Sequence, residues 1–459
     1  MLFSSISFIY YFLPILLIIY FLSKDKYKNL VLLIFSLLFY FLGEPKYIIV
    51  LVLSCCINYY LSKLIINKSN KKFYLILAIF YNILQLLTFK YTDFFIFNVN
   101  QIFNLNINYL YIVMPIGISF FTFQTLSYVI DVYNKKIKPA NNLLDFMTYV
   151  SLFPQLIAGP IVRYKDVSDE LVRREHSFKN FSEGIKRFVI GLSKKVLIAN
   201  ILGEFLKELV RVDIFSSWLK PILYTLQIYF DFSGYSDMAI GLGLMFGFHF
   251  LENFNYPLIA NSITNFWRRW HISLSSFFKD YVYIPLGGNR VSKLKWLRNI
   301  FIVWFLTGFW HGASWNFIIW GLYFGIILVI EKLFLHKYLE KTKVFKYIYT
   351  LLIVIISFLI FNSSSLNEII ISLKNMFFLI KIPFKTSETI YYLKSYSILL
   401  IISIISATPL LKTVINKINK TKFKIIIDYL EPIIYILLLV LITAFLIDES
   451  FNPFLYFRF

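Results

Sequence analysis

The stretch IIYILLLVLITAFLI, residues 433–447, decides the fold class of this chain. It is apolar all round and contains no charged residue, so no face of a helix made from it favours water. Together with its flanks it approaches the ~20 residues that a helix needs to cross a bilayer. Further runs of this kind are residues 10–22, 47–56 and 348–360. These runs predict an integral membrane protein built from spanning helices.

The composition agrees with this prediction. The 459 residues are 59% hydrophobic and 15% charged, whereas a soluble domain averages about 25% charged residues. We count about eleven candidate spans on the length criterion, and we expect an all-α polytopic membrane protein. The first candidate, residues 3–22, has no basic leader and no small-residue cleavage site, so we expect it to be retained as a helix.

The basic residues indicate how the chain crosses the membrane, although the net charge of +21 alone would also suit a nucleic-acid-binding protein. Lysines cluster after the first, third and fifth candidate spans, whereas residues 91–110 contain no Lys or Arg. This alternation follows the positive-inside rule and predicts that the N-terminus lies outside. A further lysine cluster at 412–424 puts the tail 448–459 outside as well. The expected partner of the basic residues is therefore the lipid bilayer, with no nucleic acid.

Without repeats or long polar linkers, residues 1–459 are expected to form one membrane domain with three regions. Residues 1–110 and 326–459 are simple spans, whereas residues 111–325 are rich in Gly, Pro, Trp and charge. Pro115, Gly117, Pro154 and Pro160 break this middle region. Irregular backbone persists in a membrane only when it is buried in protein or lines a cavity. We therefore expect a ring of outer helices around a core of broken, tilted and re-entrant helices that forms a tunnel.

Two of the five histidines lie in aromatic, cationic surroundings, in FWRRWH (266–271) and in LTGFWHG (306–312). Ionisable residues inside a membrane protein are functional candidates by default, and imidazole suits proton transfer near neutral pH. His311 and His271 are therefore the candidate catalytic residues. His311 lies near the end of an expected, very apolar helix, residues 300–310. The alternative for His311 is a buried structural histidine.

The first of these stretches has a helical pattern. Trp267, Trp270 and His271 recur with Leu274 at three- and four-residue spacing, which predicts a shared helix face. Arg268 and Arg269 flank them, and Trp310 precedes His311. These flanking residues are candidates for supporting the histidines and for binding the donor.

Two other groups complete the candidate site. The turn IPLGGNR (284–290) is predicted to expose backbone N–H groups beside Arg290, where an anionic donor could bind; an ordinary cytoplasmic loop is the alternative. Asp231 and Asp237 lie in a hydrophobic run, so we expect them to pair with Arg268, Arg269 or a histidine in a supporting role. No metal-binding spacing and no bound cofactor are expected.

Five stretches resemble the membrane-bound O-acyltransferase family: MPIGISF (114–120), FPQLIAGPI (153–161), YFDFSGYSD (229–237), FWRRWHISL (266–274) and WHG (310–312). The branch that they resemble most acetylates alginate or peptidoglycan, and the D-alanyl transferases of teichoic acid are more distant. The resemblance implies a membrane O-acetyltransferase in the cell membrane that takes an acyl thioester, acetyl-CoA or an acyl carrier, on the cytoplasmic side. It also implies that His311 is the catalytic histidine, that His271 is the second histidine of the active region, and that an SGNH-type partner finishes transfer to a polysaccharide outside.

The C-terminal residues FLYFRF (454–459) are similar to the terminal motif of the small companion protein of D-alanylation systems. That similarity makes Tyr456 a candidate acyl acceptor, and an interfacial aromatic anchor is the alternative. For the chain as a whole, the alternatives are D-alanyl transfer to teichoic acid, a transporter or flippase, and a scaffold without chemistry.

Overall fold

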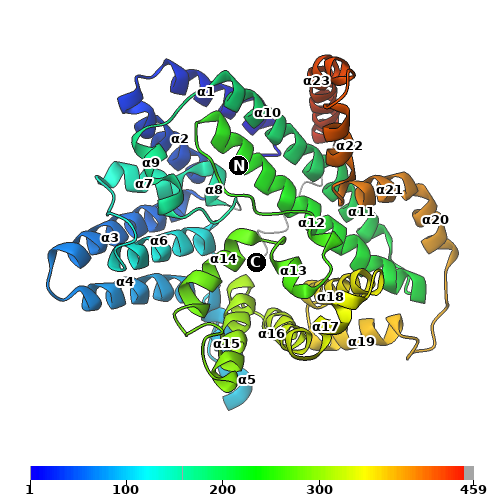
Figure 1. Cartoon of the computed structure of the whole chain (residues 1–459). Helices are drawn as coiled ribbons and strands as arrows, with labels where there is room; N and C mark the ends of the chain where they lie inside the picture. Colours follow the sequence, from blue (N-terminus) through cyan, green and yellow to red (C-terminus); the bar gives the residue numbers. More distant parts are fainter. Residues whose placement is uncertain (1, 158, 449–459) are drawn as a thin grey trace. The chain divides into compact units, whose positions relative to one another are not determined.

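The structure is a computed structural model that describes residues 2–157 and 159–448. All regular structure in these ranges is helical, as predicted (Figure 1). The chain divides into two compact units, which are described separately. The first comprises Met1–Phe188 and Tyr235–Leu251, and the second comprises Val189–Gly234 and Glu252–Phe459. Tyr456, the candidate acyl acceptor, lies outside the described residues.

In its described part, the first unit contains nine complete α-helices and most of a tenth. They are α1 (Leu13–Leu22), α2 (Lys28–Gly43), α3 (Ile48–Asn67), α4 (Lys71–Leu86), α5 (Thr92–Phe103), α6 (Ile118–Tyr133), α7 (Leu143–Ser151), α8 (Phe153–Leu156), α9 (Tyr164–Val172) and α10 (Phe178–Ser193). Helices α3, α4 and α6 pack together around buried polar side chains. Asn82 donates to Asn58 over 2.6 Å and accepts from Thr125 over 2.7 Å. These bonds satisfy polar groups that would otherwise be costly in an apolar interior.

In its described part, the second unit includes the first part of α12 and twelve further α-helices. They are α11 (Ile201–Glu208), α12 (Ile214–Met245), α13 (Ile263–Trp267), α14 (Ile272–Phe278), α15 (Lys293–His311), α16 (Trp315–Ile330), α17 (His336–Lys341), α18 (Phe345–Asn362), α19 (Leu366–Met376), α20 (Ser387–Ser395), α21 (Ser397–Ser406), α22 (Leu410–Ile418) and α23 (Lys424–Asp448). The short helices α13 and α14 confirm that the middle of the chain is broken. The residues that precede and follow them carry the candidate site.

Six helical segments of the described residues are long and apolar enough to cross a membrane. They are Asp25–Gly43, Pro45–Asn67, Lys71–Phe103, Trp315–Lys341, Phe345–Asn362 and Lys424–Asp448. The pair α20–α21, bent by 59°, makes a seventh if it is one span. The predicted polytopic membrane protein is confirmed at this level, and the count of about eleven spans stays a prediction.

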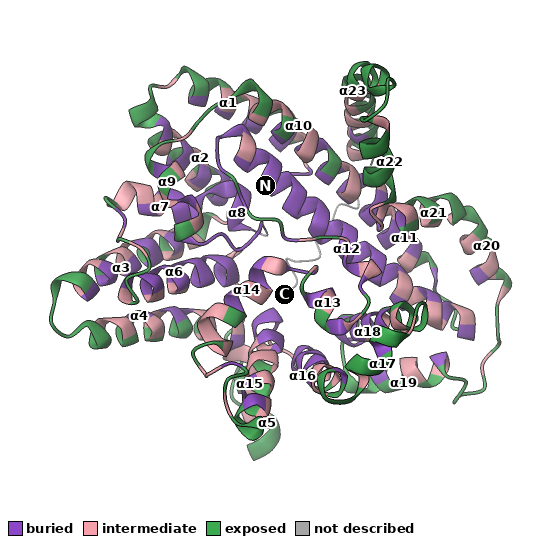
Figure 2. Ribbon diagram, in the orientation of Figure 1, coloured by how far each residue is buried: buried purple, intermediate pink, exposed green. Residues whose placement is uncertain are grey.

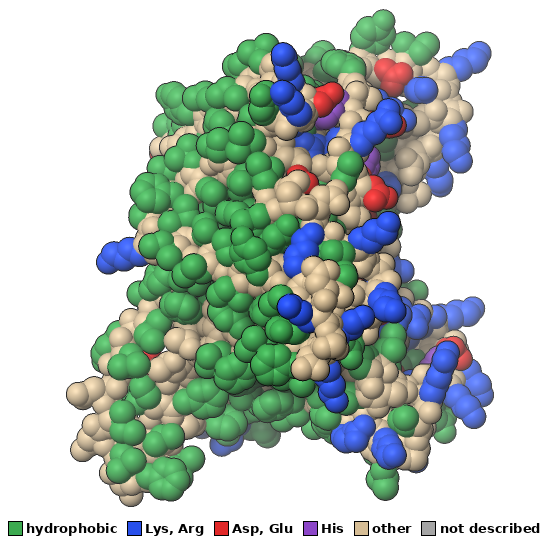
Figure 3. Space-filling model, turned by 90° about the vertical axis from the view of Figure 1, so that its left-hand side faces the viewer, with side chains coloured by type: hydrophobic (Ala, Val, Ile, Leu, Met, Phe, Trp, Pro, Cys, Tyr) green, Lys and Arg blue, Asp and Glu red, His purple; other side chains and the backbone are tan. Residues whose placement is uncertain are grey.

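The surface fits a lipid surrounding. Helix α23 exposes most of its apolar side chains, including Ile433, Leu437 and Leu441, and is largely green in Figure 2. In the space-filling view of Figure 3, hydrophobic side chains occupy much of the surface shown. In water such a surface would be costly, whereas lipid tails accept it.

Candidate functional site

His271 lies in a turn between two short helices. Helix α13 ends at Trp267, and α14 begins at Ile272 directly after the histidine. His271 has a left-handed backbone, with φ 45° and ψ 55°, and its side chain is 1% exposed. The prediction that Trp267, Trp270, His271 and Leu274 share one helix face was therefore wrong, because the helix does not continue through the histidine.

A neighbouring segment of the chain holds this turn in place. Ile272 N donates to Asn253 O over 3.0 Å, and Asn255 N donates to Arg269 O over 2.9 Å. The Asn253 side-chain oxygen lies 3.2 Å from His271 Nδ1 and also accepts from Ser273 N and Ser273 Oγ. Because this oxygen is an acceptor, it favours the tautomer of His271 that carries its proton on Nδ1.

His311 is held in a different way, at the end of the helix hairpin α15–α16. It is the last residue of α15, as the sequence predicted, and is 6% exposed. Its ring meets Trp320 at 4.9 Å and Phe361 at 5.4 Å, in both cases edge to face. Two glycines let α15 and α16 approach, since a Cβ on Gly308 would meet the carbonyl of Phe317 and one on Gly321 that of Trp304.

Trp310 joins the two histidines into one site. Its ring centroid lies 6.1 Å from that of His271 and 4.9 Å from that of His311. The other predicted tryptophans pack against further aromatic rings. Trp267 contacts Trp304 and Trp320, whereas Trp270 contacts Phe254, Phe266 and Phe358. The two histidine stretches, whose histidines are 40 residues apart in the sequence, thus meet in one aromatic cluster.

The predicted pairing of the two carboxylates was wrong. Asp231 forms an ion pair with Lys195 over 2.6 Å, and both side chains are almost fully buried. Asp237 belongs to the other unit, where it pairs with Arg187 over 2.6 Å. Two cationic partners on neighbouring segments thus provide the neutralisation that buried carboxylates need.

The predicted arginine partners have other neighbours. Arg269 donates to the Asn265 side chain over 3.0 Å and to Asn255 O over 3.1 Å, so it fastens the turn that carries His271. Arg268 is exposed. Arg269 is therefore placed to support the turn, and Arg268 is accessible.

The glycine turn before α15 also differs from its prediction. The N–H groups of Gly287, Gly288 and Arg290 donate to backbone carbonyls of the same turn. Asn299 donates to the carbonyls of Leu286 and Gly288. The turn is thus closed on itself and does not expose these N–H groups to an anion. Arg290 is exposed, so only its side chain is available there.

Glu331 is a site residue that the sequence analysis missed. Its side chain is buried and accepts from Ile263 N, Thr264 N and Thr264 Oγ1, over 2.7, 3.0 and 2.8 Å. A carboxylate at a helix N-terminus complements the helix dipole, so Glu331 fixes the start of α13. Glu331 and Thr264 are 67 positions apart in the sequence, so no motif spacing indicated their contact.

A cavity of about 290 Å³ lies in the same unit, beside this aromatic cluster. Its lining includes Tyr224, Phe358, Asn362 and Glu368. Phe358 also contacts Trp270 at 5.1 Å. Phe358 therefore belongs both to the lining of this partly polar cavity and to the contacts of the tryptophan that precedes His271.

Comparison with known proteins gives consistent results. A sequence profile of the membrane-bound O-acyltransferase family matches residues 76–371. The probable alginate O-acetylase of Pseudomonas aeruginosa is 43% identical over 378 residues, which are 80% of this chain and 73% of that protein. The peptidoglycan O-acetyltransferase of Helicobacter pylori is 37% identical over 82% of this chain and 80% of its own length. The teichoic acid D-alanyltransferase of Bacillus subtilis is 30% identical over 50% of this chain and 61% of its own.

Proposed function

This chain belongs to the membrane-bound O-acyltransferase family, and from that premise we propose that it O-acetylates an exported or cell-envelope polysaccharide. The acetyl group is favoured over D-alanine because two relatives named as O-acetylating enzymes match four fifths of the chain. The D-alanyl transferase matches half of it. The acyl group comes from a thioester, either acetyl-CoA or an acyl carrier protein.

The reaction is an acyl exchange between sulfur and oxygen. A hydroxyl of the acceptor loses its proton to His311, and its oxygen attacks the thioester carbonyl. The C–S bond then breaks, the acetyl group remains on the oxygen as an ester, and the thiolate takes up a proton. A positioned general base contributes roughly 10²–10⁴-fold to such a step.

His271 and its surroundings bind the donor and stabilise the charge that develops on the carbonyl oxygen; the ring takes part in its protonated form, in which Nε2 donates to that oxygen while Nδ1 donates to Asn253. The side chain of Asn253 orients the ring of His271 towards this role. Trp267, Trp270 and Trp310 form the apolar floor that excludes water from the reacting groups. Arg268 and Arg290 are exposed cations that attract the anionic part of the donor. Asp231 and Asp237 support the fold through their ion pairs.

The arrangement in the membrane follows from the charges. We place both termini outside the cell membrane, because the lysine clusters mark cytoplasmic loops. In this proposal the short and bent helices complete about eleven spans, and the chain is one membrane domain whose broken core surrounds a tunnel. The donor enters from the basic cytoplasmic side, and the acetyl group leaves on the outer side.

Beyond the membrane, we propose that a secreted or membrane-anchored SGNH-type partner places the acetyl group on the polysaccharide. Tyr456 is the candidate intermediate acceptor, and its phenol would receive the acetyl group as an ester. Mass spectrometry of the wild-type chain in cells without the partner tests this step. An acetyl adduct on Tyr456 of the wild type that is absent from Tyr456→Phe is expected, and an unmodified Tyr456 in the wild type would remove this residue from the pathway.

The observation that carries the proposal is the convergence of both histidines on Trp310. The test is alkali-released acetate from purified envelope polysaccharides of a deletion strain that carries wild type or His311→Ala at matched membrane levels. Acetate restored only by wild type supports the proposal and identifies the accepting polymer. Equal acetate in both would favour a transporter or scaffold, and released D-alanine in place of acetate would favour the teichoic acid reaction.

A further inference from the structure

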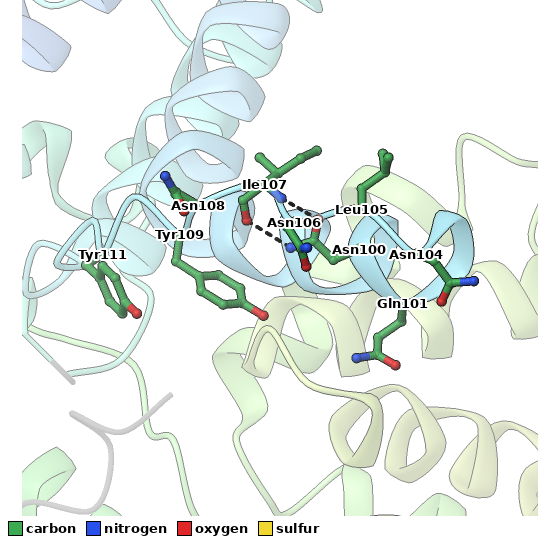
Figure 4. Close-up of a pocket in the computed structure, with 9 residues that line it drawn as sticks. All are labelled: Asn100, Gln101, Asn104, Leu105, Asn106, Ile107, Asn108, Tyr109 and Tyr111. Atoms are coloured by element: carbon green, nitrogen blue, oxygen red, sulfur yellow. Dashed lines mark hydrogen bonds between the residues drawn. The ribbon is translucent and has the colours of Figure 1, made fainter.

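A polar cavity in the first unit lies far from the histidines in sequence. It has a volume of about 650 Å³ and follows the end of α5, within residues 100–111 (Figure 4). Its polar lining consists of five amide side chains and two tyrosines, and no charged residue lines it. A cavity of this size accommodates a ligand of several sugar rings or a similar small molecule.

The loop around the cavity has a defined shape without a ligand. The Asn100 side chain donates to Ile107 O and accepts from Ile107 N, each over 2.9 Å. Asn104 ends α5 in a left-handed conformation, with φ 52°. Asp93 accepts from Leu110 N over 2.8 Å. Because these bonds order the loop in advance, a ligand would lose little affinity to ordering it.

The side chains that remain are suited to binding hydroxyl groups. Gln101, Asn104, Asn106 and Asn108 are exposed, and each amide offers both donors and acceptors. In Figure 4, Gln101 and Tyr109 extend to the opposite side of the loop from Leu105 and Ile107. A dense set of neutral amides on one loop matches the alternating donors and acceptors of a polyhydroxylated ligand.

The two tyrosines add flat apolar faces. The ring centroids of Tyr109 and Tyr111 lie 5.9 Å apart. Tyr111 is 79% exposed, and its backbone is left-handed with φ 50°. That conformation is uncommon for a bulky residue, and such strain concentrates at functional sites. The C–H faces of a sugar ring pack against rings presented in this way, while its hydroxyls reach the amides.

The absence of charged residues from the cavity lining favours an uncharged ligand. Residues 91–110 contain no Lys or Arg, and Asp93 is engaged within the loop. A polyuronate carries a carboxylate on every sugar, and the lining contains no cation that would form an ion pair with it. We propose that this cavity binds an uncharged stretch of the acceptor glycan, of the N-acetylated hexosamine class. The inference rests on the proposed function, in which this loop lies on the outer side and the acetyl group passes, through the partner, to a glycan.

The test uses the full chain in lipid nanodiscs and two probes, a tetrasaccharide of N-acetylglucosamine and a tetrasaccharide of mannuronate. Binding is followed by saturation-transfer NMR and calorimetry for wild type, Tyr109→Ala and Gln101→Ala. Tyr338→Ala is the matched control, because Tyr338 is 71% exposed and lies far along the chain in α17. We expect wild type and the control to bind the N-acetylglucosamine probe, and each cavity variant to lose about tenfold or more in affinity.

Several outcomes would overturn the inference. These are equal or better binding of the mannuronate probe, no binding of either probe by wild type, and binding that both cavity variants leave unchanged. Altered co-purification of a protein partner with unchanged sugar binding would assign the loop to that partner instead. Gln101 is exposed, so its variant remains informative if Tyr109→Ala does not fold.

A parallel measurement separates this inference from the proposed function. His311→Ala is expected to bind the N-acetylglucosamine probe as wild type does, while it releases no acetate from the envelope polymer. Sugar binding by a wild type that transfers no acetyl group would leave the cavity assigned and remove the proposed function. Acetyl transfer without sugar binding would do the reverse.

Discussion

The two histidines of the site contact the same tryptophan, yet the chain holds them by different means. His271 lies in a left-handed turn, and Asn253 contacts its ring through a side-chain oxygen. His311 ends a long helix and is enclosed by the rings of Trp320 and Phe361. Directional polar contacts therefore define one ring, whereas shape and close helix packing define the other. We expect polar substitutions to affect mainly His271 and packing substitutions to affect mainly His311.

The largest expected effect comes from exchanging the histidines themselves. His311→Ala removes the proposed general base and is expected to lower acetyl transfer by roughly 10²–10⁴-fold. His271→Ala removes a group that binds the donor and stabilises the developing charge, while it leaves the general base in place, and it is expected to cost less. Acetate released from the envelope polymer at matched protein levels measures both. A greater loss in His271→Ala than in His311→Ala would reverse the two proposed roles.

The next effect tests the packing that holds His311. In Gly308→Ala the new Cβ would meet the backbone carbonyl of Phe317, which cannot move aside as a side chain can. Overpacking of this kind costs about 1–3 kcal/mol, so we expect a lower unfolding temperature and reduced activity. Thermal unfolding in detergent measures the change.

Gly325→Ala is the matched control for this prediction. It lies on the facing helix α16, where a Cβ would meet side-chain atoms of Trp304 at 3.2 Å or more. A smaller destabilisation is expected there, since a side chain can shift. Equal unfolding temperatures for the two variants would show that the close approach of α15 and α16 does not hold the hairpin.

The sequence predicted the part of the site that depends on neighbours along the chain. An apolar run ending at His311 indicates a helix, and α15 ends at that residue. The same reasoning failed for His271. The conformation of its turn depends on backbone hydrogen bonds with residues 253–255, which are distant from the turn in the sequence. Helical spacing carries no information on such a partner, so Asn253 was not identified.

The ion pair of Asp231 also shows that the sequence does not identify partners distant along the chain. The sequence showed that Asp231, in an apolar run, needs a cation, but it offered several. The sequence analysis expected Arg268, Arg269 or a histidine as the partner, whereas the structure places Lys195 against Asp231. A buried carboxylate predicts that a partner exists, and the packing of the helices decides which one it is. The all-helical membrane fold, in contrast, follows from composition and length alone.

A smaller effect is expected from the polar contacts of His271. Asn253→Ala removes the acceptor for Ser273 and the contact with His271 Nδ1. A misplaced catalytic group costs up to about 10²-fold, and we expect roughly tenfold because the backbone pairing of the turn remains. Asn255→Ala is the control, since its side chain is exposed and only its backbone makes these bonds. Similar activities for the two variants would remove the role of Asn253.

The smallest expected effect on activity comes from substituting Glu331, which links the helix hairpin of His311 to the turn of His271. It lies beyond α16, the helix packed against α15, and it accepts three hydrogen bonds at the start of α13, the helix before His271. Glu331→Gln keeps the shape but loses the negative charge and one acceptor, at a cost of about 0.5–1.5 kcal/mol.

We expect activity to fall a few-fold in Glu331→Gln, with a small loss of thermal stability. Glu340→Gln is the control, because that carboxylate is exposed and faces only His336 at 3.4 Å. Adding Asn253→Ala to Glu331→Gln sharpens the comparison. If Glu331 acts through the turn of His271, the double variant loses less activity than the sum of the two single losses in free-energy terms. This is because both substitutions weaken contacts of the same turn. Strict additivity would mean that Glu331 stabilises α13 without positioning the histidine.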